Sequence, residues 1–112
     1  MEVPKIILFS CLVLFNIISI LFKLFPPKKI NSLYGYRTNS SMKSESTWRI
    51  ANRYFSNLLL LLNLVLSISV LLFYSFNIKI EFVLLLELLG FVFALLIGII
   101  MTEVKIKRVN NE

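Results

Sequence analysis

The chain has 112 residues, a net charge of +6, 58% hydrophobic residues and 16% charged residues. Soluble domains average roughly 45–50% apolar and about 25% charged residues, and a globule this small has too much surface to bury such an excess of apolar side chains. The composition therefore predicts a membrane protein and disfavours a cytosolic enzyme, a disulfide scaffold or a disordered tail.

The inventory of reactive side chains is short. The sequence has no histidine, no aspartate, six glutamates and a single cysteine, Cys11. One chain can therefore assemble neither a histidine-based triad nor a Cys/His zinc site nor a carboxylate-rich metal cage. We predict a protein that is not an enzyme, with no catalytic residue, no bound metal and no cofactor.

Three apolar runs dominate the chain, and each has about 20 residues. At about 1.5 Å per residue such a run crosses the roughly 30 Å core of a bilayer, and backbone groups in lipid are satisfied within a helix. We predict an all-α integral membrane protein with three transmembrane helices in one domain, 1–112. The expected segments are a first span at about 6–25, a cytoplasmic amphipathic loop and short helix at 26–53, a second span at about 54–76, a third span at about 82–101 and a cytoplasmic tail at 102–112.

The segment between the first two spans carries the most information. Pro26 and Pro27 end the first helix, because proline has no N–H and restricts the residue before it. Gly35 lies between two tyrosines, which indicates a positive φ or a close backbone approach. Ser44 is the expected N-cap of a helix that runs unbroken into the second span.

The first turns of that helix are amphipathic. Glu45, Arg49 and Arg53 follow one another at four-residue intervals and form a charged stripe. Trp48 and Asn52 lie on another face, and tryptophan favours the headgroup level of a membrane. For Arg49, Arg53 and Trp48 the alternative stays open that they only anchor the protein, as snorkelling arginines and an aromatic-belt residue. The cluster at 34–38 is expected to form a polar network that is structural or functional.

Polar residues inside the spans form a second candidate site. Asn16, Ser67 and Glu87 are expected at similar depths, and Asn63 lies one turn below Ser67 on the same face, so the four can form one cluster. A charge there is costly unless it is partnered, protonated or facing a cavity. The alternatives are interhelical hydrogen bonding, a proton or ion path, and a Glu87 that is merely interfacial. The third span also carries small residues at four-residue spacing, which permit close helix contact and offer a face for a homo-oligomer: Gly90, Ala94 and Gly98.

The distribution of lysine and arginine predicts the orientation. The N-terminal tail and the second loop together carry two cationic residues, whereas the first loop side, with Lys23 at the end of the first span, and the C-terminal tail carry ten. The positive-inside rule then places the N-terminus outside and the C-terminus in the cytoplasm. This bias explains the net charge without nucleic acid as a partner, and it makes membrane lipid the expected one.

A two-part motif in this region resembles the signature of the SdpI family. The string from Asn31 to Thr38 fits the pattern N-x-x-x-G-x-R-T, nine residues follow, and Trp48 to Arg53 fits W-x-x-A-N-[RK]. The resemblance covers roughly residues 24–100. On this basis the motif residues with a candidate function are Asn31, Gly35, Arg37, Thr38, Trp48, Asn52 and Arg53.

The resemblance implies a function that composition alone does not. The founding member of the family is a bacterial immunity protein that protects its producer from a secreted toxic peptide and holds a cytoplasmic repressor at the membrane. The resemblance thus implies a small protein of the bacterial cytoplasmic membrane that resists a membrane-active peptide by binding in the bilayer. Two alternatives stay open: a signalling scaffold that recruits a cytoplasmic regulator, and a subunit of an oligomeric transporter or channel.

Overall fold

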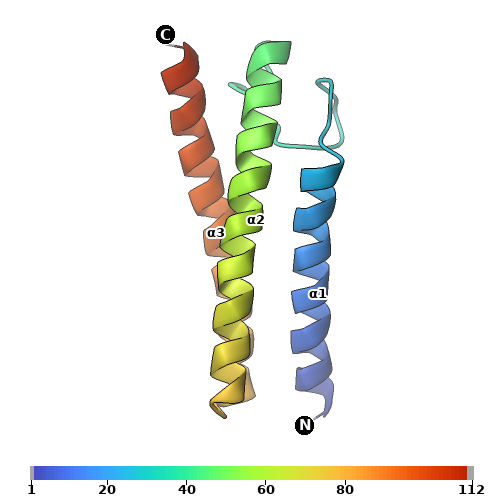
Figure 1. The fold of residues 1–112 in the computed structure, drawn as a ribbon, viewed down its shortest axis with the longest axis vertical. Coiled ribbons are helices and arrows are strands. Elements are labelled where there is room, and N and C mark those ends of the chain that lie inside the picture. Colours follow the sequence, from blue (N-terminus) through green and yellow to red (C-terminus); the bar gives the residue numbers. More distant parts are fainter. Residues whose placement is uncertain (1, 111–112) are drawn as a thin grey trace.

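The computed structural model describes residues 2–110, which form three helices in the order α1 (Glu2–Leu24), α2 (Glu45–Ser75) and α3 (Ile80–Asn110) (Figure 1). All three helices run along the longest axis of a body measuring 51 × 23 × 18 Å. Each of them is long and apolar enough to cross a membrane. The predicted all-helical fold with three candidate spans is therefore confirmed.

The segment between the first two spans differs from the prediction. Residues 25–44 are a non-helical loop, and residues 45–53 are the first turns of α2 itself. The expected cytoplasmic amphipathic loop at 26–53 is thus not supported as a unit, whereas the helix predicted to run from Ser44 unbroken into the second span is present. The physical reason is that no proline or glycine interrupts α2, while Ser44 caps it as predicted: the Ser44 Oγ accepts a hydrogen bond from the Thr47 N–H at 3.1 Å.

Helix α3 also extends past the run expected to span the membrane. It continues to Asn110, and Thr102 and Ile106 on one of its faces are buried. Residues 102–110, expected as a tail, are therefore helical; residues 111 and 112 lie outside the described part. A helix of 31 residues is about 46 Å long, so α2 and α3 both exceed the roughly 30 Å apolar core of a bilayer.

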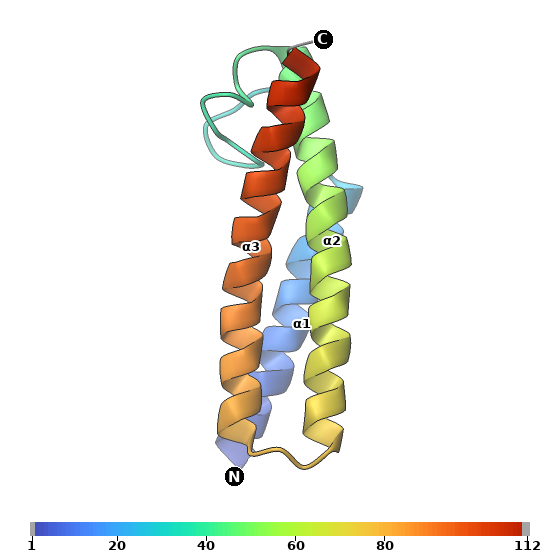
Figure 2. The same ribbon diagram turned by 90° about the vertical axis from the view of Figure 1, so that its left-hand side faces the viewer.

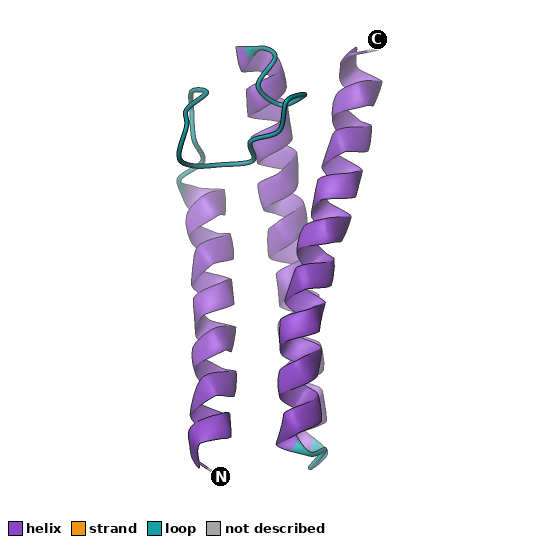
Figure 3. Cartoon of the chain, turned by 180° about the vertical axis from the view of Figure 1, so that it is seen from behind, coloured by secondary structure: helices purple, strands orange, loops and turns teal. Residues whose placement is uncertain are grey.

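Helices α2 and α3 form an antiparallel hairpin. Their short connection contains Asn77 in a left-handed conformation, with φ 61°, and it lies at the same end as the N-terminus (Figure 2). The loop of residues 25–44 lies at the opposite end, beside the C-terminal end of α3 (Figure 3). This arrangement places the end of α1, the start of α2 and the end of α3 together.

The stripe of small residues on α3 packs against α2. A Cβ atom on Gly90 would lie 2.4 Å from Leu66 Cδ1, and one on Gly98 would lie 2.8 Å from Phe55 Cε1. Ala94, which lies midway between the two glycines in the sequence, is buried. The stripe therefore brings two helices of one chain together. Since α2 occupies this face, it is not free to receive a second copy.

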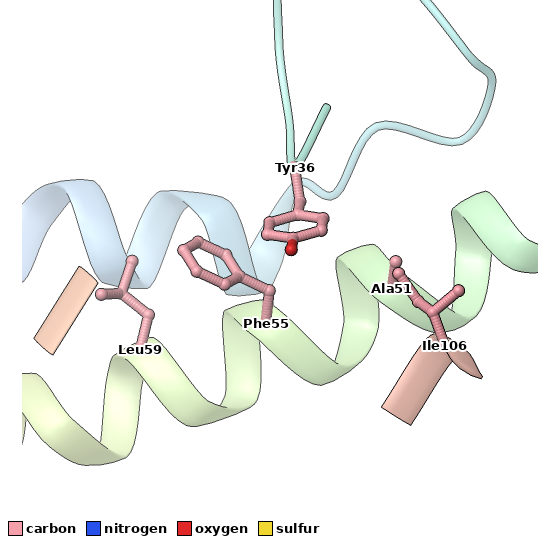
Figure 4. Close-up of a cluster of buried hydrophobic side chains, with 5 residues drawn as sticks. All are labelled: Tyr36, Ala51, Phe55, Leu59 and Ile106. Carbon is pink, nitrogen blue, oxygen red and sulfur yellow. The ribbon is translucent and has the colours of Figure 1, made fainter. Parts of the chain in front are cut away.

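The interior consists of two buried clusters, one at each end. Leu8, Val70, Ile80 and Val83 form the cluster at the hairpin end. The cluster at the loop end joins the loop, α2 and α3, and Figure 4 shows the Tyr36 ring over Phe55. The loop is thus part of the core. The members of this second cluster are Tyr36, Ala51, Phe55, Leu59 and Ile106.

The outward faces of all three helices are apolar. Ile17, Leu64 and Phe93, one from each helix, are all about half exposed or more, and many leucine, isoleucine and valine side chains share this exposure. Such a continuous apolar exterior is stable only in lipid. The exterior agrees with a multi-pass membrane protein.

Candidate functional site

The loop of residues 25–44, called the cap below, is fastened to α2 by two buried side chains. Asn52 is 2% exposed; its Oδ1 accepts from the Tyr36 N–H at 2.6 Å, and its Nδ2 donates to the Trp48 carbonyl at 2.9 Å and the Tyr36 carbonyl at 3.3 Å. Trp48 is fully buried, and its indole N–H donates to the Pro27 carbonyl at 2.9 Å. Both residues therefore hold the cap in place.

Gly35 permits the cap to approach α2. Its φ is +112°, and a Cβ atom there would lie 2.5 Å from Pro27 Cγ and 2.8 Å from the Asn52 Oδ1. An L-residue is strained by this backbone conformation, and a side chain would collide with the groups that fasten the cap. The glycine between two tyrosines is thus required by both conformation and space.

Asn31 organises the first turn of the cap. Its Oδ1 accepts from the backbone N–H groups of Leu33 at 2.9 Å and Tyr34 at 2.7 Å, a turn in which asparagine replaces a backbone acceptor. The Arg37 Nε donates to the Asn31 carbonyl at 2.8 Å, while the Arg37 side chain stays exposed. Arg37 thus closes the turn and presents a cation at the surface.

Glu103 joins the cap to α3, and the sequence analysis missed it. The Tyr36 hydroxyl donates to Glu103 Oε2 at 2.5 Å, Thr38 Oγ1 donates to the same oxygen at 2.9 Å, and the Ser40 hydroxyl donates to Oε1. One carboxylate therefore accepts three hydroxyl donors. The available signal was weak: a single acidic residue among the cations that follow the third apolar run.

The environment of Tyr36 keeps its hydroxyl a donor. Burial raises the pKa of Tyr36, and the hydrogen bond and negative charge of Glu103 raise it further, to well above the ordinary value. The phenol is therefore protonated at any physiological pH. Its hydrogen bond to Glu103 holds the cap on α3 under all such conditions.

Arg53, the last residue of the motif, lies apart from these bonds. Its side chain is exposed and lines two grooves together with Arg49. The residues of the motif therefore do not share one role. Arg37 and Arg53 both have exposed side chains, but Arg53 takes no part in building the cap. The six residues that build it are Asn31, Gly35, Arg37, Thr38, Trp48 and Asn52.

Three of the four predicted intramembrane polar residues are connected. Asn16 Nδ2 donates to Ser67 Oγ at 2.9 Å, and Ser67 Oγ donates to the Asn63 carbonyl at 2.8 Å. Asn63 Nδ2 in turn donates to Ser19 Oγ at 2.7 Å and to the Phe15 carbonyl at 2.8 Å. These bonds join α1 to α2, and Ser19 is a member that the sequence analysis did not include.

Glu87 does not share in this network. It is fully buried, and neither of its carboxyl oxygens has a hydrogen-bond partner among residues 2–110. A buried polar group without a partner costs free energy. Glu87 therefore stands out as the unsatisfied polar residue of the membrane interior, together with the Thr102 hydroxyl.

The side chains of the cap are suited to binding a partner and do not form a recognisable catalytic or metal-binding site. The hydroxyls of Tyr36, Thr38 and Ser40 are all engaged by Glu103. Within the described residues, no three histidine, cysteine, aspartate or glutamate side chains come together as metal ligands. The exposed cations at this end of the molecule include Arg37 on the cap and Arg49 and Arg53 on α2.

The segment of the chain that matches known proteins includes this same region. The model of the SdpI/YfhL protein family matches residues 28–102, which include most of the cap, all of α2 and most of α3. The chain is 55% identical over 51 residues to YfhL of Bacillus subtilis (strain 168), a protein described as uncharacterized. That match spans 46% of each chain, less than half of the relative's length. No solved structure matches. The chain belongs to the SdpI/YfhL protein family.

Proposed function

We propose that this protein protects a bacterial cell against a membrane-active toxic peptide by binding it in the bilayer without catalysis. The observation that carries the proposal is the construction of the cap. Six motif residues form one fastened unit on the ends of α2 and α3, and this unit holds the exposed Arg37 in a fixed place. A pre-organised surface of this kind suits recognition, because little ordering is needed when a partner binds.

The proposal includes a location and an orientation. The protein lies in the cytoplasmic membrane, with the N-terminus outside and the C-terminus in the cytoplasm. The ten-to-two distribution of cations supports this orientation. Under it, the cap lies at the cytoplasmic surface, and Glu87 and the Asn16–Asn63–Ser67 network lie within the membrane.

Membership of the SdpI/YfhL family supports the immunity role, since the family resemblance implies protection against a toxic peptide. The chemistry of the cap supports a role without catalysis. Its hydroxyls are held by Glu103 and its buried amide by backbone groups, so these side chains are committed to structure. The exposed groups that remain include the cations Arg37, Arg49 and Arg53, which attract peptides and lipids of opposite charge.

A survival assay tests the proposal. The chain is expressed in a bacterium sensitive to a secreted toxic peptide of the kind that family members resist, and survival is compared between wild type and Arg37→Ala. We expect wild type to protect, and Arg37→Ala to insert normally but protect poorly. Lys43→Ala is the matched control, because Lys43 is an exposed cation of the same loop outside the motif.

Membrane fractionation of each variant separates loss of function from loss of protein. Equal survival with and without the wild-type chain would refute the immunity role for that peptide. Equal protection by Arg37→Ala and wild type would remove Arg37 from the binding surface. Glu87→Gln, tested in parallel, asks whether the membrane interior contributes as well.

A further inference from the structure

Two grooves flank α2 at the cap end. The first, of about 360 Å³, lies between α2 and α3 and is lined by Arg49, Arg53, Tyr54 and Lys105 among others. The second, of about 250 Å³, lies between α2 and the start of the cap, where Lys28 contributes a wall. Arg49 and Arg53, one helical turn apart, line both. The grooves therefore form one double groove that shares two arginines.

Every charged side chain that lines this double groove is a cation. Arg49, Arg53 and Lys105 line the first groove, and Lys23 and Lys28 join the arginines in the second. Like charges one turn apart on a helix repel each other. An anion seated between them relieves that repulsion, and arginine in particular binds phosphate through paired hydrogen bonds.

Among residues 2–110, no acidic side chain lines the double groove. Glu45 lies one turn before Arg49 on α2, but it lines neither groove. Glu103 on α3 is held by the hydroxyls of the cap. The negative charge that balances the double groove is therefore expected from a ligand.

The double groove is pre-formed. The Lys105 Nζ lies 6.0 Å from the centre of the Tyr54 ring, a cation–π contact that holds the ammonium at the edge of the groove. The Lys23 ammonium donates to the Asn57 side-chain oxygen, which ties the end of α1 to α2. Pro27, in the wall of the second groove, is held by the Trp48 indole.

The surroundings favour a lipid over a free anion. Arg49 and Arg53 immediately precede the apolar run of α2, and Lys105 follows that of α3, so the cations lie at the level of lipid headgroups. A further groove shares Tyr54 and Lys105 and is lined by Arg108 on one side of Lys105 along α3 and by Met101 and Val104 on the other. Met101 and Val104 are 42% and 50% exposed. A ligand with a phosphate and an acyl chain matches this change from cationic to apolar surface.

We propose that the double groove binds the phosphate group of an anionic membrane phospholipid between Arg49, Arg53 and Lys105, with an acyl chain along the exposed face of α3. Basic pockets between transmembrane helices are established binding sites for anionic headgroups. The inference is independent of the immunity role. It assigns to Arg53, the motif residue that does not build the cap, the function of holding a lipid.

Native mass spectrometry tests the proposal on the full chain. The protein is purified in a neutral detergent and titrated with phosphatidylglycerol or phosphatidylcholine, and retained lipid is counted. We expect one phosphatidylglycerol to bind in preference to phosphatidylcholine. In Arg49→Gln/Arg53→Gln this affinity should fall by roughly tenfold or more, because each cation near an anionic lipid adds measurably to binding.

Matched variants separate a site from general charge attraction. Lys43→Gln/Lys107→Gln removes two exposed cations that line neither groove, and it should bind phosphatidylglycerol within about twofold of wild type. An equal loss in both double variants would overturn the proposal, as would unchanged binding in Arg49→Gln/Arg53→Gln. Circular dichroism checks that each variant keeps its helices, and Lys105→Gln supplies a second test from α3.

Inorganic phosphate distinguishes the two sources of a phosphate group. It is added to the complex of wild type with phosphatidylglycerol at millimolar concentration. Retention of the lipid supports a phospholipid as the occupant, because the acyl chain adds apolar contact that free phosphate lacks. Displacement of the lipid by inorganic phosphate would overturn the assignment to a lipid.

Discussion

The side chain of Asn52 in α2 replaces a strand partner for Tyr36 in the cap: its amide oxygen accepts from the Tyr36 N–H at 2.6 Å, and its amide nitrogen donates to the Tyr36 carbonyl at 3.3 Å. Both backbone groups of one loop residue are thus satisfied by one side chain. The same amide nitrogen also donates to the Trp48 carbonyl at 2.9 Å. Only a primary amide supplies this acceptor and two donors from one buried position.

Asn52→Asp should therefore release the cap although the side chains have the same shape. The carboxylate keeps the acceptor but presents a second oxygen to the carbonyls of Tyr36 and Trp48. We expect a loss of about 1–3 kcal/mol in unfolding free energy, the cost of unsatisfied buried polar groups. Denaturation with SDS in mixed micelles measures it. Asn57→Asp, an exposed position on the same helix, is the control, and a similar loss there would contradict the interpretation.

Gly35→Ala tests the close approach of the cap to α2. The added methyl group would meet Pro27 Cγ at 2.5 Å and the Asn52 Oδ1 at 2.8 Å, at a φ of +112°. A strained backbone position costs on the order of 1–3 kcal/mol, so we expect a clear fall in stability. Gly90→Ala serves for comparison, because its methyl group meets the movable end of the Leu66 side chain. A larger loss in Gly90→Ala would show that the cap tolerates displacement.

The bond between Tyr36 and Glu103 predicts a response to alkaline pH. Because folding raises the pKa of Tyr36, its contribution to stability is complete below the unfolded value of about 10 and is lost as the pH rises above it. Tyrosinate absorbance of wild type minus Tyr36→Phe should stay near zero until the chain unfolds. A difference signal that titrates near pH 10 in the folded chain would show that the Tyr36 hydroxyl is neither buried nor held by Glu103.

Glu103→Gln should loosen the cap without unfolding the helices. The substitution removes one of the two oxygens that accept from Tyr36, Thr38 and Ser40. Hydrogen–deuterium exchange should quicken in residues 34–42 and stay unchanged in the middle of α2. Glu81→Gln, an exposed carboxylate at the start of α3, is the control. Equal protection of the cap in both variants would mean that the hydroxyls do not depend on the charge of Glu103.

The features that the sequence predicted are those that depend on local chemistry. The three apolar runs predict helices because lipid leaves no other structure for the backbone. Ser44 was identified as an N-cap from its position, and the positive φ at Gly35 from its neighbours. Asn16 and Ser67 were expected at one depth from simple counting along two helices, and they are joined at 2.9 Å.

The features that the sequence did not predict depend on tertiary register. Glu103 meets Tyr36 and Ser40 across more than 60 residues of chain, and nothing local indicates that pairing. The resemblance predicts that the motif residues have a function, whereas in the structure most of them fasten the cap. That division depends on which side of α2 each residue faces once the loop is in place. Trp48 faces the cap, Asn52 lies between the cap and the second groove, and Arg53 lines both grooves.

Replacement of Glu87 should have opposite effects on stability and on function. Its buried carboxyl has no hydrogen-bond partner among residues 2–110, and an ionisable group inside a membrane protein is a functional candidate. Glu87→Leu should raise the unfolding free energy by about 1–3 kcal/mol, since it removes an unsatisfied buried group, and should lower protection in the survival assay. SDS titration measures the first effect.

Asn63→Leu is the matched control, because the Asn63 amide donates to both Ser19 and the Phe15 carbonyl. Removal of these bonds should lower stability by about 0.6–1.7 kcal/mol, the range for interhelical hydrogen bonds in membranes. If the unfolding free energy falls in Asn63→Leu and rises in Glu87→Leu, Asn63 is a residue that joins two helices, whereas Glu87 is retained for a purpose other than stability. A loss of stability in Glu87→Leu as large as that in Asn63→Leu would instead make Glu87 a structural residue, because a partner would then have to satisfy its carboxyl.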